Sequence, residues 1–184
     1  DRALLIDGAR RSIANGLKNG RPARVQHGTF SPALETFRAT FVTLNQNGRL
    51  RGCIGSILPH CSLIEDVATN AHKAAFSDPR FPQLTAAEIG SLDLSVSILS
   101  NARPIAFGSE AEAIDALQPD VDGVILEADG PDGQSRRGLF LPQVWETVPK
   151  AEQFLRHLKA KAGLPQDYWD SSIRLWRYTT ETFH

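Results

Sequence analysis

The pair Asn47-Gly48 constrains the fold of this chain more than any other feature of the sequence. It stands between two runs, residues 37–45 and 49–57, whose residue pattern is typical of β-strands. Asn-Gly is the preferred pair for a two-residue type I′ turn, which joins neighbouring antiparallel strands. The sequence therefore predicts a hairpin and favours an antiparallel sheet over a doubly wound parallel one.

The turn also predicts the register of this hairpin. If Asn47 and Gly48 form the loop, Gln46 pairs with Arg49 and Val42 pairs with Cys53. Because side chains alternate between the faces of a strand, one face is expected to carry Arg51, Cys53, Val42 and Leu44.

Further helices and strands follow from hydrophobic spacing and from capping and stop signals. Helices are expected over 5–17, 62–76, 109–117 and 149–162, with a short one after Thr85, and strands over 92–98, 121–128, 136–141 and 173–176. Capping pairs are predicted at Ser62 and Glu65, Thr85 and Glu88, and Ser109 and Glu112. The predicted fold is α+β, with a mainly antiparallel sheet, surrounding helices and a single domain over residues 1–184.

The charge balance argues against two classes of partner. The chain has 20 Lys and Arg against 21 Asp and Glu, a formal net charge of −1. This balance gives no general attraction to nucleic acid or to an anionic membrane. No apolar run approaches the ~20 residues of a membrane span, and the first residues lack the basic start of a secretion signal. The basic side chains near the last helix are interpreted as solvated: Lys150, Arg156, Lys159 and Lys161.

The cysteines and histidines give no recognised metal motif. Cys53 and Cys61 form no CxxC pair, and the five histidines are scattered without HxxxH spacing. We therefore expect neither a dedicated metal site nor a cofactor, although ligands can converge from distant positions. Two free thiols without a signal segment fit the reducing cytoplasm.

Four motifs in order resemble those of a known family: LRGCIG at 50–55, DPRF at 78–81, LFLPQV at 139–144 and KAGLP at 161–165. The chain resembles the AmmeMemoRadiSam system protein A family, also called the AMMECR-type domain, from about Thr40 to the C-terminus. The LRGCIG string is the most specific of the four motifs.

The resemblance implies an α+β fold of two unequal lobes, with a cleft between the lobes that holds the LRGCIG strand. It also implies a system with a Memo-type protein and a radical S-adenosylmethionine (SAM) protein. We expect binding or processing of a small acidic or aromatic metabolite in the cleft lined by Cys53. A noncatalytic binding or adaptor module is the alternative, and a nucleic-acid binder is disfavoured by the charge; whether the chain is an enzyme stays open.

Cys53 is the candidate catalytic residue of the LRGCIG motif. It could be a nucleophile, with Arg51 favouring its thiolate, or a small buried side chain. Gly52 and Gly55 weaken a strand and so suggest either a β-bulge or a place where a ligand or another backbone approaches closely. Arg51 could bind an anionic ligand or could form an ion pair with an acidic loop residue.

The other candidate ligand-binding residues lie outside the hairpin. Asp78 could act as a base or orient Arg51, but a structural role that ties down the turn is favoured. Arg80 is the better candidate for ligand binding and is expected to form an anion-accepting pocket with Arg51. Gln143 could bind a ligand or cap the next element, and His72 could reach Cys53 as a base or simply pack at the helix edge.

Overall fold

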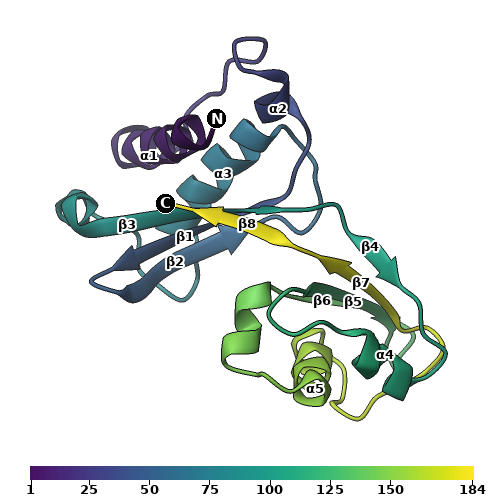
Figure 1. The fold of residues 1–184 in the computed structure, drawn as a ribbon. Helices are drawn as coiled ribbons and strands as arrows, with labels where there is room; N and C mark the ends of the chain where they lie inside the picture. The colour runs from purple at the N-terminus through teal and green to yellow at the C-terminus, as the bar shows by residue number, and fades with distance from the viewer. The chain divides into compact units, whose positions relative to one another are not determined.

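The computed structural model describes residues 1–184, and these residues form two compact units. Unit 1 consists of Asp1–Leu99 and Glu181–His184, and unit 2 of Ser100–Thr180. Each unit combines helices with a four-stranded sheet, as Figure 1 shows. The α+β fold with antiparallel pairing is therefore confirmed. None of the helices is both long and apolar enough to cross a membrane.

Unit 1 packs two long helices against one face of its sheet (Figure 1). The sheet has the order β2-β1-β3-β8, and β1 pairs antiparallel with both β2 and β3. The elements are α1 (Arg2–Asn19), α2 (Pro32–Glu35), β1 (Thr40–Gln46), β2 (Arg49–Gly55), α3 (Leu63–Phe76), the 3-10 helix η1 (Ala86–Ser91), β3 (Leu92–Leu99) and β8 (Thr180–Phe183).

The core of unit 1 lies between its helices and its sheet. Val42 and Leu44 of β1 are fully buried there, together with Ala9 of α1 and Ala71 of α3. Small residues on the helices let the backbones lie close to the sheet, and the buried apolar area is the main stabilising contribution. The even-numbered residues of β1 thus face the helices, and the odd-numbered ones face the opposite side of the sheet.

Unit 2 has the strand order β4-β7-β5-β6, and every pairing is antiparallel. Its core includes Trp145 stacked on Phe154, with ring centroids 3.8 Å apart. The elements are β4 (Arg103–Ile105), α4 (Glu110–Ala116), β5 (Gly123–Asp129), β6 (Ser135–Phe140), the 3-10 helix η2 (Pro142–Glu146), α5 (Ala151–Lys161) and β7 (Arg174–Tyr178).

Local signals predicted most of these boundaries. Helix α3 begins one residue after the predicted start and ends where predicted, and Gly20 ends α1 in the left-handed conformation, with φ 67°. Thr85 and Glu88 form the predicted capping box, and the Ser109 hydroxyl caps α4.

Two local predictions were wrong. Ser62 makes no side-chain cap on α3, and Glu65 contacts His27 rather than the cap position. Lys159 is fully buried rather than solvated, because its Nζ donates hydrogen bonds to Glu110 (2.7 Å) and to the carbonyl of Tyr168 (3.1 Å). A buried ammonium is tolerated only with such partners.

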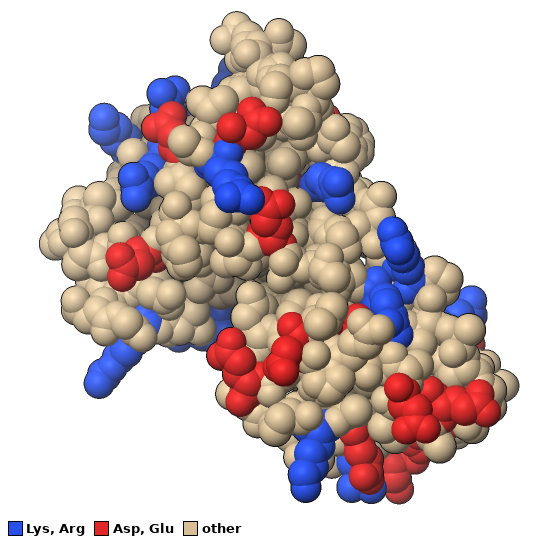
Figure 2. Space-filling view, viewed as in Figure 1, with Lys and Arg blue, Asp and Glu red and all other residues tan.

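Charged side chains of both signs are spread over the face shown in Figure 2. This mixture agrees with the formal net charge of −1, and the absence of a nucleic-acid partner stays a prediction.

Candidate functional site

A β-bulge in the β1–β2 hairpin decides where the thiol of Cys53 lies. The predicted pair of Gln46 with Arg49 is confirmed, but the register shifts between Leu44 and Asn45. Leu44 therefore pairs with Gly52, and Cys53 lies opposite Thr43 rather than Val42. The predicted shared face of Cys53 with Val42 was wrong because Arg51 is an extra residue in β2. Cys53 instead lies on the sheet face away from α1 and α3, where it is partly exposed.

The two glycines of the motif have a packing reason. A Cβ on Gly52 would lie 2.2 Å from the carbonyl oxygen of Ala74 in α3, so only glycine lets this helix pack directly on β2. A Cβ on Gly55 would lie 2.3 Å from the ring of Phe41. The predicted close approach at both positions is therefore made by the protein itself, and ligand binding by Gly52 or Gly55 stays a prediction.

Asp78 holds the backbone of Cys53 and the DPRF loop together. Its buried carboxylate, 4% exposed, accepts the backbone N–H of Cys53 (2.9 Å) and that of Arg80 (3.1 Å). The Arg80 guanidinium adds two further hydrogen bonds to the same carboxylate, at 2.9 and 2.7 Å. These hydrogen bonds, led by the guanidinium of Arg80, hold the pKa of Asp78 well below its usual range. Asp78 thus has the favoured structural role, and it orients Arg80 rather than Arg51.

Arg80 links this loop to the cysteine. Its Nη2 donates to the carbonyl of Cys53 at 3.1 Å, and its side chain is still 54% exposed. The pKa of the guanidinium is raised, first by its hydrogen bond with Asp78 and to a smaller extent by the Cys53 side chain. The Nη1 atom makes no hydrogen bond, so Arg80 offers a fixed, accessible cation beside the thiol.

The thiol itself has one hydrogen-bond partner. The hydroxyl of Thr43 donates to Sγ of Cys53 at 3.3 Å. No carboxylate or imidazole bonds to this sulfur, so the arrangement lacks the adjacent base that usually activates a nucleophile. Thr43 was not recognised as a site residue in the sequence, because the predicted register did not place it opposite Cys53.

The side chain of Arg51 forms an ion pair within the protein. Its guanidinium bonds both carboxylate oxygens of Glu88, at 2.7 and 3.3 Å, and the carbonyl of Pro82 at 3.0 Å. The residue is only 9% exposed. The ion pair considered in the sequence analysis is thus what the structure shows. Arg51 and Arg80 each bind their own carboxylate, so the expected anion pocket shared by the two was wrong.

We expect the Arg51–Glu88 pair to make stability depend on pH. The guanidinium of Arg51, followed by hydrogen bonds from Thr85, lowers the pKa of Glu88 from 4.5 to about 2. A carboxyl group whose pKa is lower in the folded state stabilises the fold at pH values above its unfolded-state pKa. This contribution is lost as the pH falls from about 4.5 towards 2. At pH 7 the free energy of unfolding of the wild-type chain should exceed that of Glu88→Gln by about 1–2 kcal/mol, after allowance for the partial exposure of the Glu88 side chain. Urea denaturation of both proteins at pH 7, 4 and 2.5 measures this difference. A difference in unfolding free energy that stays constant over these pH values would contradict the prediction.

His72 is directed away from the cysteine, and Gln143 belongs to the other unit. His72 is on α3 beside Gly16 of α1 and packs against Phe76, with ring centroids 5.0 Å apart. It therefore faces the helix layer, opposite to the Cys53 face, and burial lowers its pKa. Gln143 belongs to η2 of unit 2, where it is exposed and makes no side-chain hydrogen bond. Its role in ligand binding stays a prediction.

Comparisons with known proteins agree with this architecture. The AMMECR1 family model matches residues 6–183. A protein of Methanothermobacter thermautotrophicus is 35% identical, and the match covers 98% of this chain and 92% of that protein. A protein of Thermotoga maritima is also 35% identical, and the match covers 94% of this chain and 92% of that protein. The crystal structure of an uncharacterized protein from Pyrococcus horikoshii is 34% identical and covers 98% of this chain and 89% of its own, with a TM-score of 0.86. The chain belongs to the AMMECR1 family.

Proposed function

We propose that this chain binds a small acidic metabolite at the Cys53–Arg80 site of unit 1. The observation that carries the proposal is the position of Arg80: Asp78 fixes its guanidinium beside Cys53, and its side chain stays 54% exposed. An arginine held in this way presents free N–H donors to a carboxylate or phosphate at little further entropic cost.

In this proposal the role of Cys53 is to shape the site. The thiol accepts a hydrogen bond from Thr43. The backbone N–H of Cys53 donates to Asp78, and its carbonyl accepts a hydrogen bond from Arg80. Such a residue is fixed in position, but no neighbouring base withdraws its proton. A binding role therefore fits these contacts better than nucleophilic catalysis, and an enzymatic reaction at Cys53 is the second candidate.

We also propose that the chain works with a Memo-type protein and a radical SAM protein in the cytoplasm. This part rests on the motif resemblance, and family membership supports it. The substrate of such a system would be the acidic metabolite held at Arg80.

Substitutions at Cys53 in a strain that lacks the native gene test the role of the thiol. We expect Cys53→Ala and Cys53→Ser to restore the wild-type metabolite profile, because neither adds bulk. Cys53→Leu should fail, since its side chain would fill the space beside Arg80. If Ala and Ser both abolish complementation while the proteins stay folded, covalent or redox chemistry at Cys53 replaces the binding account. A deletion strain with no change in any acidic metabolite would contradict the proposed substrate class.

A further inference from the structure

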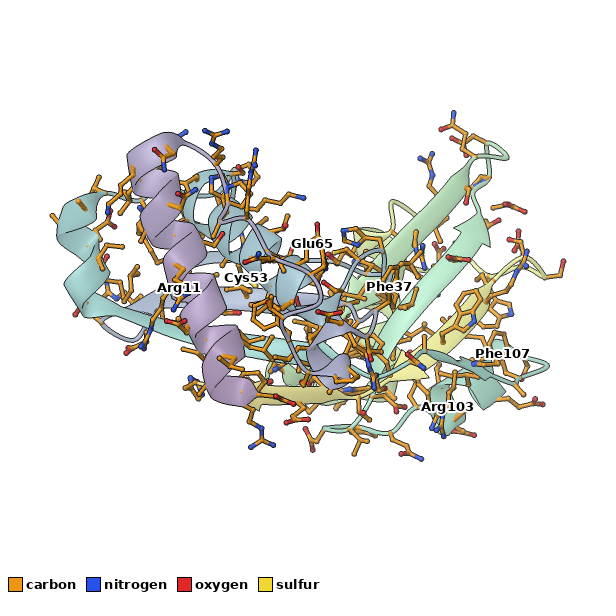
Figure 3. All side chains as sticks on the ribbon, turned by 90° about the horizontal axis from the view of Figure 1, so that it is seen from above. Arg11, Phe37, Cys53, Glu65, Arg103 and Phe107 are labelled. Carbon is orange, nitrogen blue, oxygen red and sulfur yellow. The ribbon has the colours of Figure 1, made fainter.

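A second cluster of reactive side chains lies in unit 1, at the beginning of α3. His60 and Cys61 precede this helix, and Asp66 is in its first turns. One ligand atom from each of the three lies within 4.8 Å of the others. Nδ1 of His60 is 3.7 Å and Sγ of Cys61 is 3.9 Å from the same oxygen, Oδ1 of Asp66. Glu65, labelled in Figure 3, marks this end of the helix.

The two separations from the Asp66 oxygen are close to those of a tetrahedral metal centre, and the third, from Nδ1 of His60 to Sγ of Cys61, is within 4.8 Å. Zinc bonds of about 2.0 Å to nitrogen and oxygen and about 2.3 Å to sulfur place tetrahedral ligand atoms about 3.3–3.5 Å apart. The observed distances of 3.7 and 3.9 Å exceed these values by only a few tenths of an ångström. A mixed set of imidazole, thiolate and carboxylate ligands favours zinc over the harder magnesium and calcium ions.

The carboxylate of Asp66 is oriented by the surrounding protein. It is fully buried, and its Oδ2 accepts hydrogen bonds from the backbone and hydroxyl of Thr40 (2.9 and 2.6 Å) and from Asn70 (2.9 Å). Its Oδ1 accepts a hydrogen bond from Ser56 at 2.6 Å and faces His60 and Cys61. Metal-binding carboxylates are typically held by such a second layer of hydrogen bonds.

We propose that His60, Cys61 and Asp66 form a zinc site with three protein ligands and a fourth position open to water. His60 is 57% exposed at its side chain, so the open position lies on the solvent side. Its Nδ1 is also 3.2 Å from the carbonyl of Leu58, and zinc binding requires this atom to present its lone pair to the metal, with the proton on Nε2.

The charges around Cys61 agree with a site for a cation. The carboxylates of Asp66 and Glu65 place negative charge beside this thiol. A bound dication would oppose the same negative field and stabilise the thiolate, with release of the thiol proton to solvent.

Cobalt(II) replaces zinc at such sites and reports on sulfur ligation, which makes it the probe for this proposal. We expect cobalt(II) chloride, added to the reduced full-length chain, to give a thiolate-to-metal charge-transfer band and intense tetrahedral visible bands, both removed by zinc chloride. The charge-transfer band should be lost in Cys61→Ser and retained in the matched control Cys53→Ser, which removes the other thiol. His60→Ala should weaken cobalt binding by more than about tenfold.

Three outcomes would overturn the zinc site: no charge-transfer band in the wild-type chain, a band that persists in Cys61→Ser, or a band that disappears in Cys53→Ser. Backbone circular dichroism of each variant establishes that it is folded, so that a missing band reports on the ligand and not on unfolding. His60 is exposed, so His60→Ala keeps the proposal testable should the cysteine variant misfold.

Discussion

Asp78→Ala is expected to lower the free energy of unfolding by about 3 kcal/mol, because it leaves several hydrogen-bonding groups without their partner. The substitution removes an acceptor of the N–H of Cys53 and releases the guanidinium of Arg80. The measurement is urea denaturation followed by backbone circular dichroism. Tryptophan fluorescence is unsuitable, since all three tryptophans lie in unit 2 and Asp78 lies in unit 1.

Asp93→Ala is the matched control for this prediction. Asp93 lies on β3 of the same unit, is exposed and makes no side-chain hydrogen bond or ion pair. We expect it to change the free energy of unfolding by less than about 0.5 kcal/mol. If Asp78→Ala is as mild as this control, Asp78 does not hold Cys53 and Arg80 together, and the account of the site is wrong.

Gly52→Ala is expected to lower the free energy of unfolding by about 3 kcal/mol, as much as Asp78→Ala. This value is near the upper end of the usual cost of overpacking a core. The new Cβ would lie 2.2 Å from the backbone oxygen of Ala74, in the last turns of α3. A side chain could rotate away from such a clash, but a helix carbonyl moves only with the helix. Relief therefore requires α3 or β2 to shift and disturbs the buried core between them.

Gly90→Ala controls for the general effect of adding a methyl group at a glycine. A Cβ at Gly90 would meet no atom within 4 Å, and the backbone there is not in the left-handed region. We expect a change of less than about 0.5 kcal/mol for this variant. A Gly52→Ala protein with wild-type stability in the same denaturation experiment would show that the helix does not press on β2 as described.

The sequence predicted the elements of this fold better than it predicted the contacts of the site. The turn at Asn47-Gly48, the helix over 62–76 and the hairpin of unit 2 follow from local signals that depend on few neighbours. Strands β4 and β8 are only three and four residues long, and so carry too little pattern to be recognised. Their formation depends on pairing with distant strands.

The face occupied by Cys53 could not be predicted for a physical reason. The bulge adds Arg51 to one strand only, and a shift of one residue moves every later side chain to the other face. The glycines of the motif indicate a bulge as one of two interpretations, but they do not give its position. The neighbours that favour this position, Ala74 over Gly52 and Glu88 beside Arg51, come from later elements. The motif did predict that Cys53 and the DPRF loop belong to one site, although it paired the wrong arginine with Asp78.

The alkylation selectivity of Cys53 tests the proposed anion site most directly. The measurement compares the rates of anionic iodoacetate and neutral iodoacetamide at Cys53, in a Cys61→Ser background, with and without the substitution Arg80→Gln. The Arg80 cation should raise the iodoacetate-to-iodoacetamide rate ratio roughly fivefold over the ratio in Arg80→Gln, since charges about 4 Å apart in water interact by about 1 kcal/mol. Circular dichroism checks that Arg80→Gln is folded. Equal rate ratios with and without Arg80 would contradict an anion-accepting site at Cys53.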